Sequence, residues 1–376
     1  MKVAIVTHSF VENDGQGRVN LEVVRGLVAA NHEVELIAAK VAPELLAMPG
    51  VHWTPVSHGP LPTNLLRNAW FSRRAARELR RMRGTVDLTM ANGAITSAAV
   101  DVNAVHFVHG GWAASPYYEP GRGLRGVYQR LYTWMNERLE LQAFARCSRI
   151  IAVSGQVADE IVALGVPREK IETVPNGVDT NVFYPQAEKV SDLGLPAGQV
   201  RALFVGDIVS RRKGLDTVLA ALPGVDGLGL VVVGRTEASP YPQEVQAAGL
   251  SDRVVFLGFR RDVAAIMRAC DFFVFPSRYE PFGLVILEAL ASGLPVITAR
   301  TAGIVDLLGD DVCIKLDDPD NVPALHAALQ RLTTDPELRL EMGKRARDCA
   351  LTLTWQTMAE HYVAVFEEVL AQKSAR

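Results

Sequence analysis

Residues 271–298 read DFFVFPSRYEPFGLVILEALASGLPVIT, which combines a strand pattern, a loop, a helical pattern and a second strand pattern. The apolar run Asp271–Phe275 predicts a buried strand, the stretch after Gly283 predicts a helix, and Pro295–Thr298 predicts a further strand. A strand, a helix and a strand in this order indicate a right-handed crossover within a parallel sheet. The segment therefore predicts an α/β fold.

The same alternation continues outward in two series. The first predicts strands at Val3–Thr7, Glu33–Ala38, Asp87–Met90, Ala104–Val108, Arg149–Val153 and Lys170–Val174, and helices at Gly17–Ala30, Leu65–Met82 and Gln156–Leu164. The second adds strands at Val200–Val205, Gly229–Val233 and Arg253–Leu257, and helices after Lys213 and Asp262. Pro, Asn-Gly and Pro within residues 174–185 mark a hinge candidate between them. We therefore expect two doubly wound domains that bind ligands at the carboxyl ends of their strands.

The composition is that of an ordinary globular protein. Of 376 residues, 49% are hydrophobic and 22% are charged, which excludes disordered, collagen-like and disulfide-rich classes. The net charge of −3 argues against a nucleic-acid partner. Apolar runs are too short for a signal peptide or a membrane-spanning helix, so we expect a cytoplasmic protein, at most peripheral on the inner face of the cell membrane. The cysteines form no C-x-x-C pair, and we expect four buried thiols: Cys147, Cys270, Cys313 and Cys349.

Two loops at the expected ligand edge carry glycines or cations. The first, Gly15-Gln16-Gly17-Arg18, opens a helix, where glycine permits close approach and the helix N-terminus favours anions. It is not the dinucleotide pattern G-x-G-x-x-G, whose third glycine would fall at Asn20, and this argues against a nicotinamide cofactor. The second, Arg211-Arg212-Lys213, can neutralise a diphosphate. A solvated basic loop is the alternative.

Two glutamates lie within residues 271–298. Glu280 precedes the predicted helix, and Glu288 lies inside it among apolar residues, a costly setting unless the carboxylate has a partner. Two ribose hydroxyls would be such a partner. A glycosidase pair is the alternative, but the position of Glu288 within a helix favours hydroxyl recognition. Backbone N–H groups at the helix N-terminus can hold phosphate or sugar oxygens, and they belong to Phe282, Gly283, Leu284 and Val285.

This segment resembles the E-x7-E motif of retaining glycosyltransferases with the GT-B fold, specifically glycosyltransferase family 4. Glu280 and Glu288 have the spacing of that motif, and a Gly-x-Pro-Val sequence closes it. The resemblance extends along the chain, through the loop at 15–17, Val174–Asp179, Arg212-Lys213-Gly214, Val232-Val233-Gly234 and a closing helix from Trp355. It implies two Rossmann-like domains facing each other across a cleft, residues 1–182 on the acceptor side and 186–356 on the sugar-nucleotide side, with 357–376 crossing back to the first.

The resemblance also implies roles for individual residues. His109, at the end of an N-domain strand, would contact the transferred sugar, and Arg18 would lie on the acceptor side; a hydrogen-bonded core histidine is the alternative for His109. Arg212 and Lys213 would hold the diphosphate, and His109, Arg212, Lys213 and Glu280 would be the catalytic set. Glu280 would bind the donor sugar, Glu288 the ribose, and the backbone at Gly258 and Phe259 the base. The other donor-binding candidates are Gly15, Gly17, Gly206, Gly234, Phe282, Gly283, Leu284 and Val285.

Some positions depart from the family pattern. Asp207 stands where many members have an arginine, which leaves the charge to Arg212 and Lys213, and Gln16 interrupts a common Gly-Gly pair. Thr301-Ala302-Gly303 replaces another Gly-Gly pair and leaves the sugar open. Asp318-Pro319-Asp320 has the form of a D-x-D metal motif, but it precedes a late helix, so we predict N-capping there and no catalytic metal.

A basic, partly apolar surface is predicted in the first domain. Leu65–Arg83 carries seven arginines and one acid, and its start is rich in apolar residues. A second stretch, Arg122 to Arg149, carries six arginines, two glutamates and several aromatic residues. Basic helices with aromatic residues suit an anionic membrane surface. A helix packed by one face, with solvated arginines on the other, is the alternative.

These observations predict a metal-independent retaining transferase with no cofactor. Its donor would be a nucleotide-diphosphate sugar, UDP in preference to GDP, and it would move a hexosyl unit to a saccharide or lipid-linked acceptor in cell-envelope glycan synthesis. Two alternatives stay open: a sugar-nucleotide hydrolase or epimerase of the same fold, and a non-catalytic sugar-nucleotide-binding partner. Product analysis with and without acceptor separates them.

Overall fold

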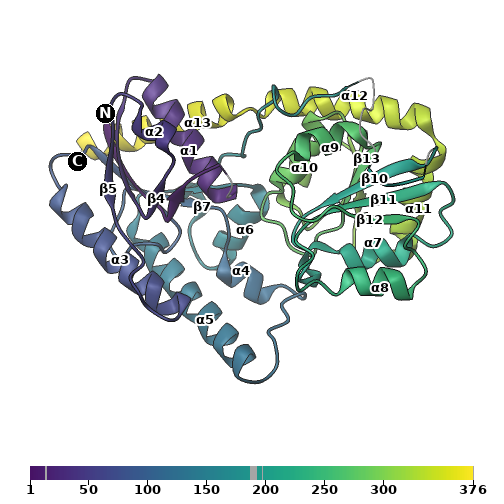
Figure 1. Ribbon diagram of the computed structural model, residues 1–376. Helices are drawn as coiled ribbons and strands as arrows, with labels where there is room; N and C mark the ends of the chain where they lie inside the picture. The colour runs from purple at the N-terminus through teal and green to yellow at the C-terminus, as the bar shows by residue number, and fades with distance from the viewer. Residues whose placement is uncertain (13–14, 187–192, 197, 376) are drawn as a thin grey trace. The chain divides into compact units, whose positions relative to one another are not determined.

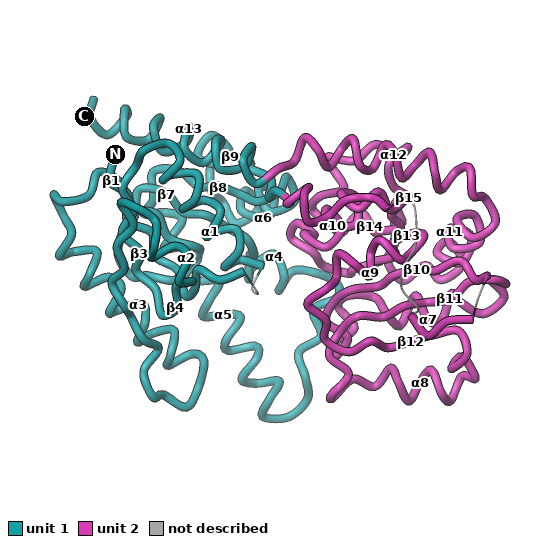
Figure 2. Tube along the Cα trace, turned by 45° about the horizontal axis from the view of Figure 1, so that its top comes forward, with its two compact units in different colours: residues 1–177, 355–376 teal, residues 178–354 magenta. Residues whose placement is uncertain are grey.

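The computed structural model describes residues 1–12, 15–186, 193–196 and 198–375, which form two compact units (Figures 1 and 2). Unit 1 comprises residues 1–177 and 355–376, and unit 2 comprises residues 178–354. The junction lies before the expected boundary at 182–186, because unit 2 holds the chain from Val178 onward. Val178 donates to the carbonyl of Leu353 at 3.0 Å, and the Arg347 guanidinium donates to the carbonyls of Thr180 and Phe183. The chain returns to unit 1 at Trp355 rather than at 357.

Unit 1 is built on a parallel sheet with the strand order β5-β3-β1-β6-β7-β8-β9. Helices α1 and α13 lie on one face of this sheet, and α3 and α5 lie on the other, as Figure 1 shows. Its strands are β1 (Lys2–Val6), β3 (Glu33–Ala38), β5 (Val51–Pro55), β6 (Leu88–Asn92), β7 (Val102–Val105), β8 (Arg149–Ala152) and β9 (Ile171–Thr173), beside a small pair, β2 (Ser9–Phe10) and β4 (Lys40–Val41). Its helices are α1 (Gly15–Ala29), α2 (Pro43–Leu46), α3 (Asn64–Arg81), α4 (His109–Ala114), α5 (Gly123–Arg146), α6 (Gly155–Ala163), the 3-10 turn η1 (Arg168–Lys170) and α13 (Trp355–Ser374).

Unit 2 is built on a second parallel sheet, with the order β12-β11-β10-β13-β14-β15. The chain reverses its direction of winding between β10 and β13, and such a switch point is where doubly wound sheets bind ligands. Its strands are β10 (Val200–Val205), β11 (Leu228–Val233), β12 (Val254–Phe256), β13 (Phe272–Phe275), β14 (Val296–Ala299) and β15 (Cys313–Leu316). Its helices are η2 (Arg211–Lys213), α7 (Leu215–Ala221), α8 (Tyr241–Ala247), α9 (Val263–Ala269), α10 (Leu284–Ala291), η3 (Gly303–Leu307), α11 (Val322–Thr334) and α12 (Pro336–Thr352).

The predicted architecture of two doubly wound domains is confirmed, and β3 and β10 have the predicted bounds. The strand expected at Ala104–Val108 is present with different bounds, because β7 covers Val102–Val105. Its neighbours end early: β6 stops at Asn92, opposite Ala104, and β8 stops at Ala152, opposite Val105. The chain then leaves the sheet, so His109 begins helix α4 and does not end a strand.

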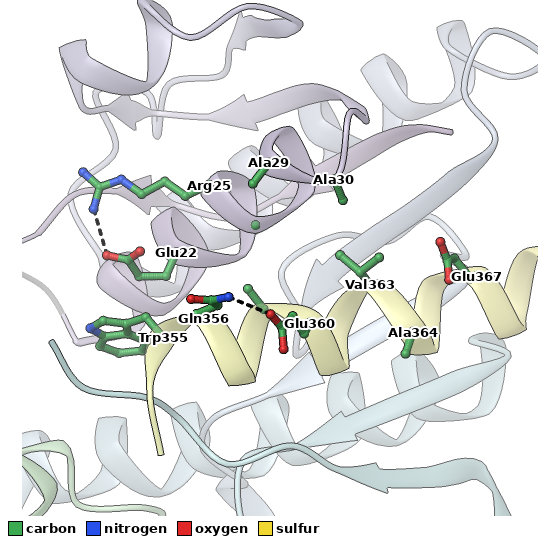
Figure 3. Close-up of a pocket in the computed structure, with 12 residues that line it drawn as sticks. Glu22, Arg25, Ala29, Ala30, Trp355, Gln356, Glu360, Val363, Ala364 and Glu367 are labelled. Atoms are coloured by element: carbon green, nitrogen blue, oxygen red, sulfur yellow. Dashed lines mark hydrogen bonds and ion pairs between the residues drawn. The ribbon is translucent and has the colours of Figure 1, made fainter. Parts of the chain in front are cut away.

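Helix α13 returns to pack against α1 in unit 1. A Cβ atom on Gly26 would lie 2.3 Å from the Cβ of Ala359, so glycine lets the two helices approach closely. Beside this contact lies a cavity of about 610 Å³, with Glu22, Arg25, Trp355 and Glu360 on its wall (Figure 3). Within the described ranges, no helix is both long and apolar enough to cross a membrane.

The cysteines are free thiols, and three of them are buried. Cys349 is half-buried rather than buried, because it lies near the exposed end of α12. Burial raises the pKa of Cys147 to about 11 and that of Cys313 to about 12, so both stay protonated at neutral pH.

Candidate functional site

Three glycines close the carboxyl edge of the sheet in unit 2. Gly206 follows β10 and donates to the carbonyl of Val233 at 3.0 Å, and Gly234 follows β11 and donates to the carbonyl of Gly258 at 3.0 Å. A Cβ atom on Gly234 would lie 2.4 Å from the carbonyl oxygen of Gly206. The backbones of these two loops are therefore in direct contact. The predicted glycines 206, 234 and 258 therefore lie together at the ends of adjacent strands.

The switch point brings Lys213 and Glu280 into an ion pair. Lys213 ends η2 after β10, and Glu280 lies in the loop after β13. Gly214 has φ +77°, and a Cβ atom there would lie 2.1 Å from the carbonyl oxygen of Pro276, so only glycine lets the two loops meet. Burial lowers the pKa of Lys213, and the Glu280 carboxylate opposes this shift. The pair thus combines a buried cation with a carboxylate at the ligand edge.

Arg278 anchors this part of the site. Its guanidinium donates to both carboxylate oxygens of Asp216, at 2.8 and 3.0 Å, and to Asp320 at 2.7 Å. Partial burial alone would lower the pKa of Arg278, but the hydrogen bonds and charges of Asp216 and Asp320 raise it by more. The guanidinium therefore stays charged. The arginine thereby ties the loop after β13 to α7 and to the turn before α11. Nearby, Arg212 donates to the carbonyl of Tyr279 at 3.2 Å.

The turn before α11 corrects one prediction. Asp318 and Asp320 do not cap the helix: the N-cap is Asn321, whose side chain accepts from the N–H of Ala324 at 3.0 Å. Asp320 is instead held by Arg278, and Asp318 accepts the N–H of Asp320 at 2.9 Å. Arg278 competes successfully for Asp320 because it offers two charged N–H donors, whereas a helix N-terminus offers a neutral one.

The first carboxylate of the motif is fixed by its backbone. The backbone N–H of Glu280 donates to the carbonyl of Thr301 at 3.1 Å, and its carbonyl accepts from the N–H of Gly303 at 2.8 Å. Residues 301–303, which differ from the family pattern, therefore lie beside Glu280. Gly283 has φ +105° and is the N-cap of α10, so the N-cap residue itself has no side chain to accept from the first N–H groups of the helix. Phe282 is buried, and Leu284 and Val285 form the first turn. Glu288 lies in the second turn of α10 and is half-buried.

A cavity of about 510 Å³ lies at the edge of the same sheet, lined by Val209, Arg235, Glu237 and Phe259. The Phe259 side chain is 59% exposed, and the Arg235 guanidinium lies 5.3 Å from the centre of its ring. Asp207, at the departure from the family pattern, accepts from the N–H of Val209 at 3.0 Å and so shapes the loop beside this cavity. Of the two predicted base-contacting residues, Phe259 therefore lines this open cavity, and Gly258 directly precedes it in the chain.

In unit 1, His109 is held by a buried carboxylate that the sequence did not predict. Glu140 of α5 lies with Oε1 2.6 Å from Nδ1 of His109 and accepts the backbone N–H of His109 on Oε2 at 2.9 Å. Glu140 is 2% exposed, whereas the His109 side chain is 28% exposed. The imidazole is thus fixed on one edge and accessible on the other.

Arg18, the predicted acceptor-side cation, is paired with carboxylates of its own region of unit 1. It pairs with Glu22 at 2.8 Å and Glu12 at 3.2 Å, and its guanidinium lies 5.7 Å from the ring of Trp355. Gly15 begins α1 and Gly17 is buried within it. Asp14, which precedes this loop, lies outside the described residues. The positive charge of Arg18 is therefore paired with two carboxylates, Glu12 and Glu22.

Comparison with known families accounts for nearly the whole chain. Residues 13–182 match the family model described as Glycosyltransferase Family 4, and residues 185–348 match the model described as Glycosyl transferases group 1. The chain is a GT-B glycosyltransferase. The second model covers the strands, loops and carboxylates of the site in unit 2, and the first covers His109 and Glu140 in unit 1.

Individual relatives agree with this family. The glycosyltransferase is 26% identical to the MMP alpha-(1->4)-mannosyltransferase of Mycolicibacterium hassiacum over the full length of both chains. It is 30% identical to the D-inositol 3-phosphate glycosyltransferase of Thermobifida fusca over 61% of this chain, a match that spans only 57% of that relative.

Solved structures show the same fold. The glycosyltransferase aligns with sucrose-phosphate synthase from Thermosynechococcus elongatus with a TM-score of 0.81 at 22% identity, covering 99% of each chain. It aligns with Anabaena Alr3699/HepE, a structure containing UDP and glucose, with a TM-score of 0.74 at 20% identity, covering 98% of this chain and 99% of that one.

Proposed function

We propose that this glycosyltransferase moves a hexosyl unit from a nucleotide-diphosphate sugar to a saccharide or lipid-linked acceptor, with retention of anomeric configuration. The observation that carries the proposal is the pairing of Lys213 with Glu280 at the switch point of unit 2, beside Arg212 and the glycine loops. A mannosyltransferase and an inositol 3-phosphate glycosyltransferase among the relatives support a glycosyl donor. Cell-envelope glycan synthesis is the proposed setting.

The diphosphate is proposed to bind Lys213 and Arg212. Both cations lie after β10, and the N-terminus of α10 supplies further N–H groups close in the chain to Glu280. Charged donors placed around the leaving oxygen stabilise the negative charge that develops there. The proposal needs no cofactor and no catalytic metal, since fixed cations supply the charge. Asp320, in the D-x-D sequence, is already paired with Arg278.

The two carboxylates of the motif, Glu280 and Glu288, are proposed to bind hydroxyl groups of the donor. Glu280 would accept hydrogen bonds from the donor sugar, and Glu288, in the second turn of α10, would accept from both ribose hydroxyls. The nucleobase would stack on the exposed face of Phe259 in the 510 Å³ cavity, beside Arg235. We propose UDP rather than GDP as the nucleotide; the Anabaena protein bound to UDP supports this choice.

Retention is proposed to follow from attack on the same face from which the diphosphate leaves. The bond between the anomeric carbon and the phosphate oxygen breaks, the acceptor oxygen bonds to that carbon, and the leaving phosphate oxygen takes the acceptor proton. No protein carboxylate acts as nucleophile. His109 would contact the transferred sugar in the reacting complex.

The outer surface of α3 and α5 supports a further part of the proposal, contact with an anionic membrane. The two helices lie side by side in both views (Figures 1 and 2), joined by a hydrogen bond from Asn68 to Tyr132 at 3.4 Å. Together they carry ten arginines and three glutamates, in a chain of net charge −3. Exposed apolar side chains lie among these cations, and we call the whole the α3–α5 surface: Leu66 and Trp70 on α3, and Leu124, Val127, Leu131 and Trp134 on α5.

Helical periodicity explains why this apolar stripe is exposed. On α5, the buried residues Gly126, Thr133 and Glu140 repeat every seven positions along one side of the helix. Leu124, Val127, Leu131 and Trp134 repeat at spacings of three and four on the opposite side. A second copy of this cationic surface would be repelled, whereas anionic lipid would neutralise the arginines and cover the stripe.

Product analysis tests the proposed transfer. The glycosyltransferase is incubated with UDP-hexoses and GDP-hexoses, with and without saccharide acceptors, and nucleotide release is measured together with the anomeric NMR signals of the product. We expect acceptor-dependent release from a UDP-sugar and a product with the donor's anomeric configuration. Inversion, or release independent of acceptor, would contradict the proposal.

A further inference from the structure

We propose that Glu140 is a positioning residue that keeps the proton of His109 on Nδ1, so that Nε2 accepts a hydrogen bond from a hydroxyl of the transferred sugar. The part concerning the sugar rests on the proposed function, whereas the part concerning the proton concerns this pair alone. Glu140 and His109 are 31 residues apart and belong to α5 and α4.

The hydrogen bonds around Glu140 determine which nitrogen carries the proton. A carboxylate only accepts hydrogen bonds, so the atom 2.6 Å from Oε1, Nδ1 of His109, must be the donor. The same carboxylate accepts the backbone N–H of His109 at 2.9 Å, which fixes it in place. A neutral imidazole with its proton on Nδ1 has a lone pair on Nε2. Because Glu140 is 2% exposed, water does not compete for it.

The segment that follows His109 is also rigid. A Cβ atom on Gly110 would lie 2.9 Å from Leu164, and one on Gly111 would lie 2.3 Å from the Glu160 carboxylate, so α4 is pressed against α6. The rings of Phe107 and Tyr132 lie 5.1 and 6.1 Å from that of His109. Backbone, ring plane and proton are thus fixed before substrate binds, which is the condition for an oriented contact.

This arrangement selects a class of sugar. A lone pair on Nε2 binds a hydroxyl, which donates, and it rejects a carboxylate or carbonyl oxygen, which only accepts. The inference therefore predicts a neutral hexose with a hydroxyl at the position facing His109, in preference to a uronic acid. A donor with fluorine in place of that hydroxyl loses the contact, because fluorine cannot donate.

The substitution Glu140→Gln tests the inference without removing the backbone contact. The amide carbonyl still accepts the N–H of His109, while the amide nitrogen donates to Nδ1 and moves the proton to Nε2. We expect kcat to fall at least tenfold, with the affinity for UDP and the KM for the donor changed less than twofold. Glu137→Gln, one turn earlier on α5, is the matched control and should keep the kcat of the unmodified protein.

Nitrogen-15 NMR of the imidazoles shows directly which ring nitrogen carries the proton. His109→Ala identifies the His109 signals among the eight histidines. We expect a proton on Nδ1 in the unmodified protein and on Nε2 in Glu140→Gln, at equal melting temperature. A proton on Nε2 in the unmodified protein, or full kcat in Glu140→Gln, overturns the inference. If the NMR result holds but His109→Ala keeps full kcat, the sugar contact is wrong, and the pairing of Glu140 with the Nδ1 proton stands.

Discussion

Lys213 is the residue on which nucleotide affinity is expected to depend. Lys213→Ala removes the buried cation proposed to hold the diphosphate, and a hydrogen bond to a charged group contributes about 1.5–3 kcal/mol. About 1.4 kcal/mol corresponds to tenfold in affinity. We therefore expect calorimetry to show at least a tenfold weaker affinity for UDP. Lys344→Ala, an exposed position on α12, should leave it unchanged.

The variant also leaves Glu280 without its cation, so folding must be checked separately. Circular dichroism and melting of Lys213→Ala, and of the double variant Lys213→Ala/Glu280→Gln, distinguish a lost phosphate contact from a damaged fold. Unchanged UDP affinity in a folded Lys213→Ala protein contradicts the assignment of Lys213 to the diphosphate.

Glu288 and His109 are expected to affect different quantities. Glu288→Ala removes an acceptor of ribose hydroxyls, so UDP affinity should fall at least tenfold. His109→Ala should leave that affinity nearly unchanged and lower kcat, because its proposed contact is to the sugar and forms in the reacting complex. Calorimetry with UDP and rates with the full donor measure the two. Equal losses of UDP affinity in both variants would show that His109 contacts the nucleotide.

The site could be predicted from the sequence only where its residues are neighbours in the chain. Glu280, Glu288 and the cations after β10 lie in short strings whose residue types indicate their chemistry. Glu140 lies 31 residues from His109, and the sequence placed it only among the charges of a basic stretch. Arg278 stood inside the quoted segment, but its partners Asp216 and Asp320 are 62 and 42 residues away. Tertiary packing, which local patterns do not encode, makes these pairs.

At the scale of elements, the α3–α5 surface is expected to bind anionic vesicles. Vesicles of equal parts phosphatidylglycerol and phosphatidylcholine should sediment with the protein, and salt should release it because exposed charges are screened. Replacing Arg73, Arg74, Arg77 and Arg80 with Gln should abolish sedimentation and leave UDP affinity intact. Vesicles of phosphatidylcholine alone are the lipid control.

The apolar stripe on α5 requires its own variant. Leu131→Ser with Trp134→Ser should weaken vesicle binding at least tenfold, because Trp134 is 50% and Leu131 46% exposed, and both would leave water at the membrane. Leu340→Ser on α12, 62% exposed, is the matched control. Equal binding to neutral vesicles, or no effect of the arginine changes, would favour solvated helices instead.

The strands were predictable where a short, mostly apolar run stands between helical stretches. β3 and β10 have the predicted ends, although β3 includes Glu33 and Glu35 and β10 includes Arg201. β15 was missed because its four residues include a lysine, and β5 because most of its side chains are not buried. α5 was noticed for its charge and not as a helix, since its exposed apolar stripe hides the periodicity of its buried face.

At the scale of the whole molecule, turnover is expected to survive chelation. Lys213 and Arg212 are proposed to supply the charge that a metal would otherwise bring to the diphosphate. The rate with a UDP-sugar should therefore be unchanged in excess EDTA after dialysis. A loss of activity that manganese or magnesium restores would contradict the proposed metal-independent reaction.

Hydrogen exchange can assign the nucleotide to one unit. UDP is expected to slow the exchange of amides at the carboxyl edge of unit 2, namely residues 206–214, 234–237 and 280–288, because ligand binding raises the cost of opening the loops that it contacts. At 100 times its dissociation constant, the ligand stabilises the bound form by about 2.7 kcal/mol, enough to slow such openings about a hundredfold. With bare UDP, residues 109–114 of unit 1 should exchange as they do in the free protein. With the full donor, the segment at 109–114 should become protected, since only the sugar is proposed to meet His109. Equal protection of that segment by bare UDP would contradict the division of the two roles between the units.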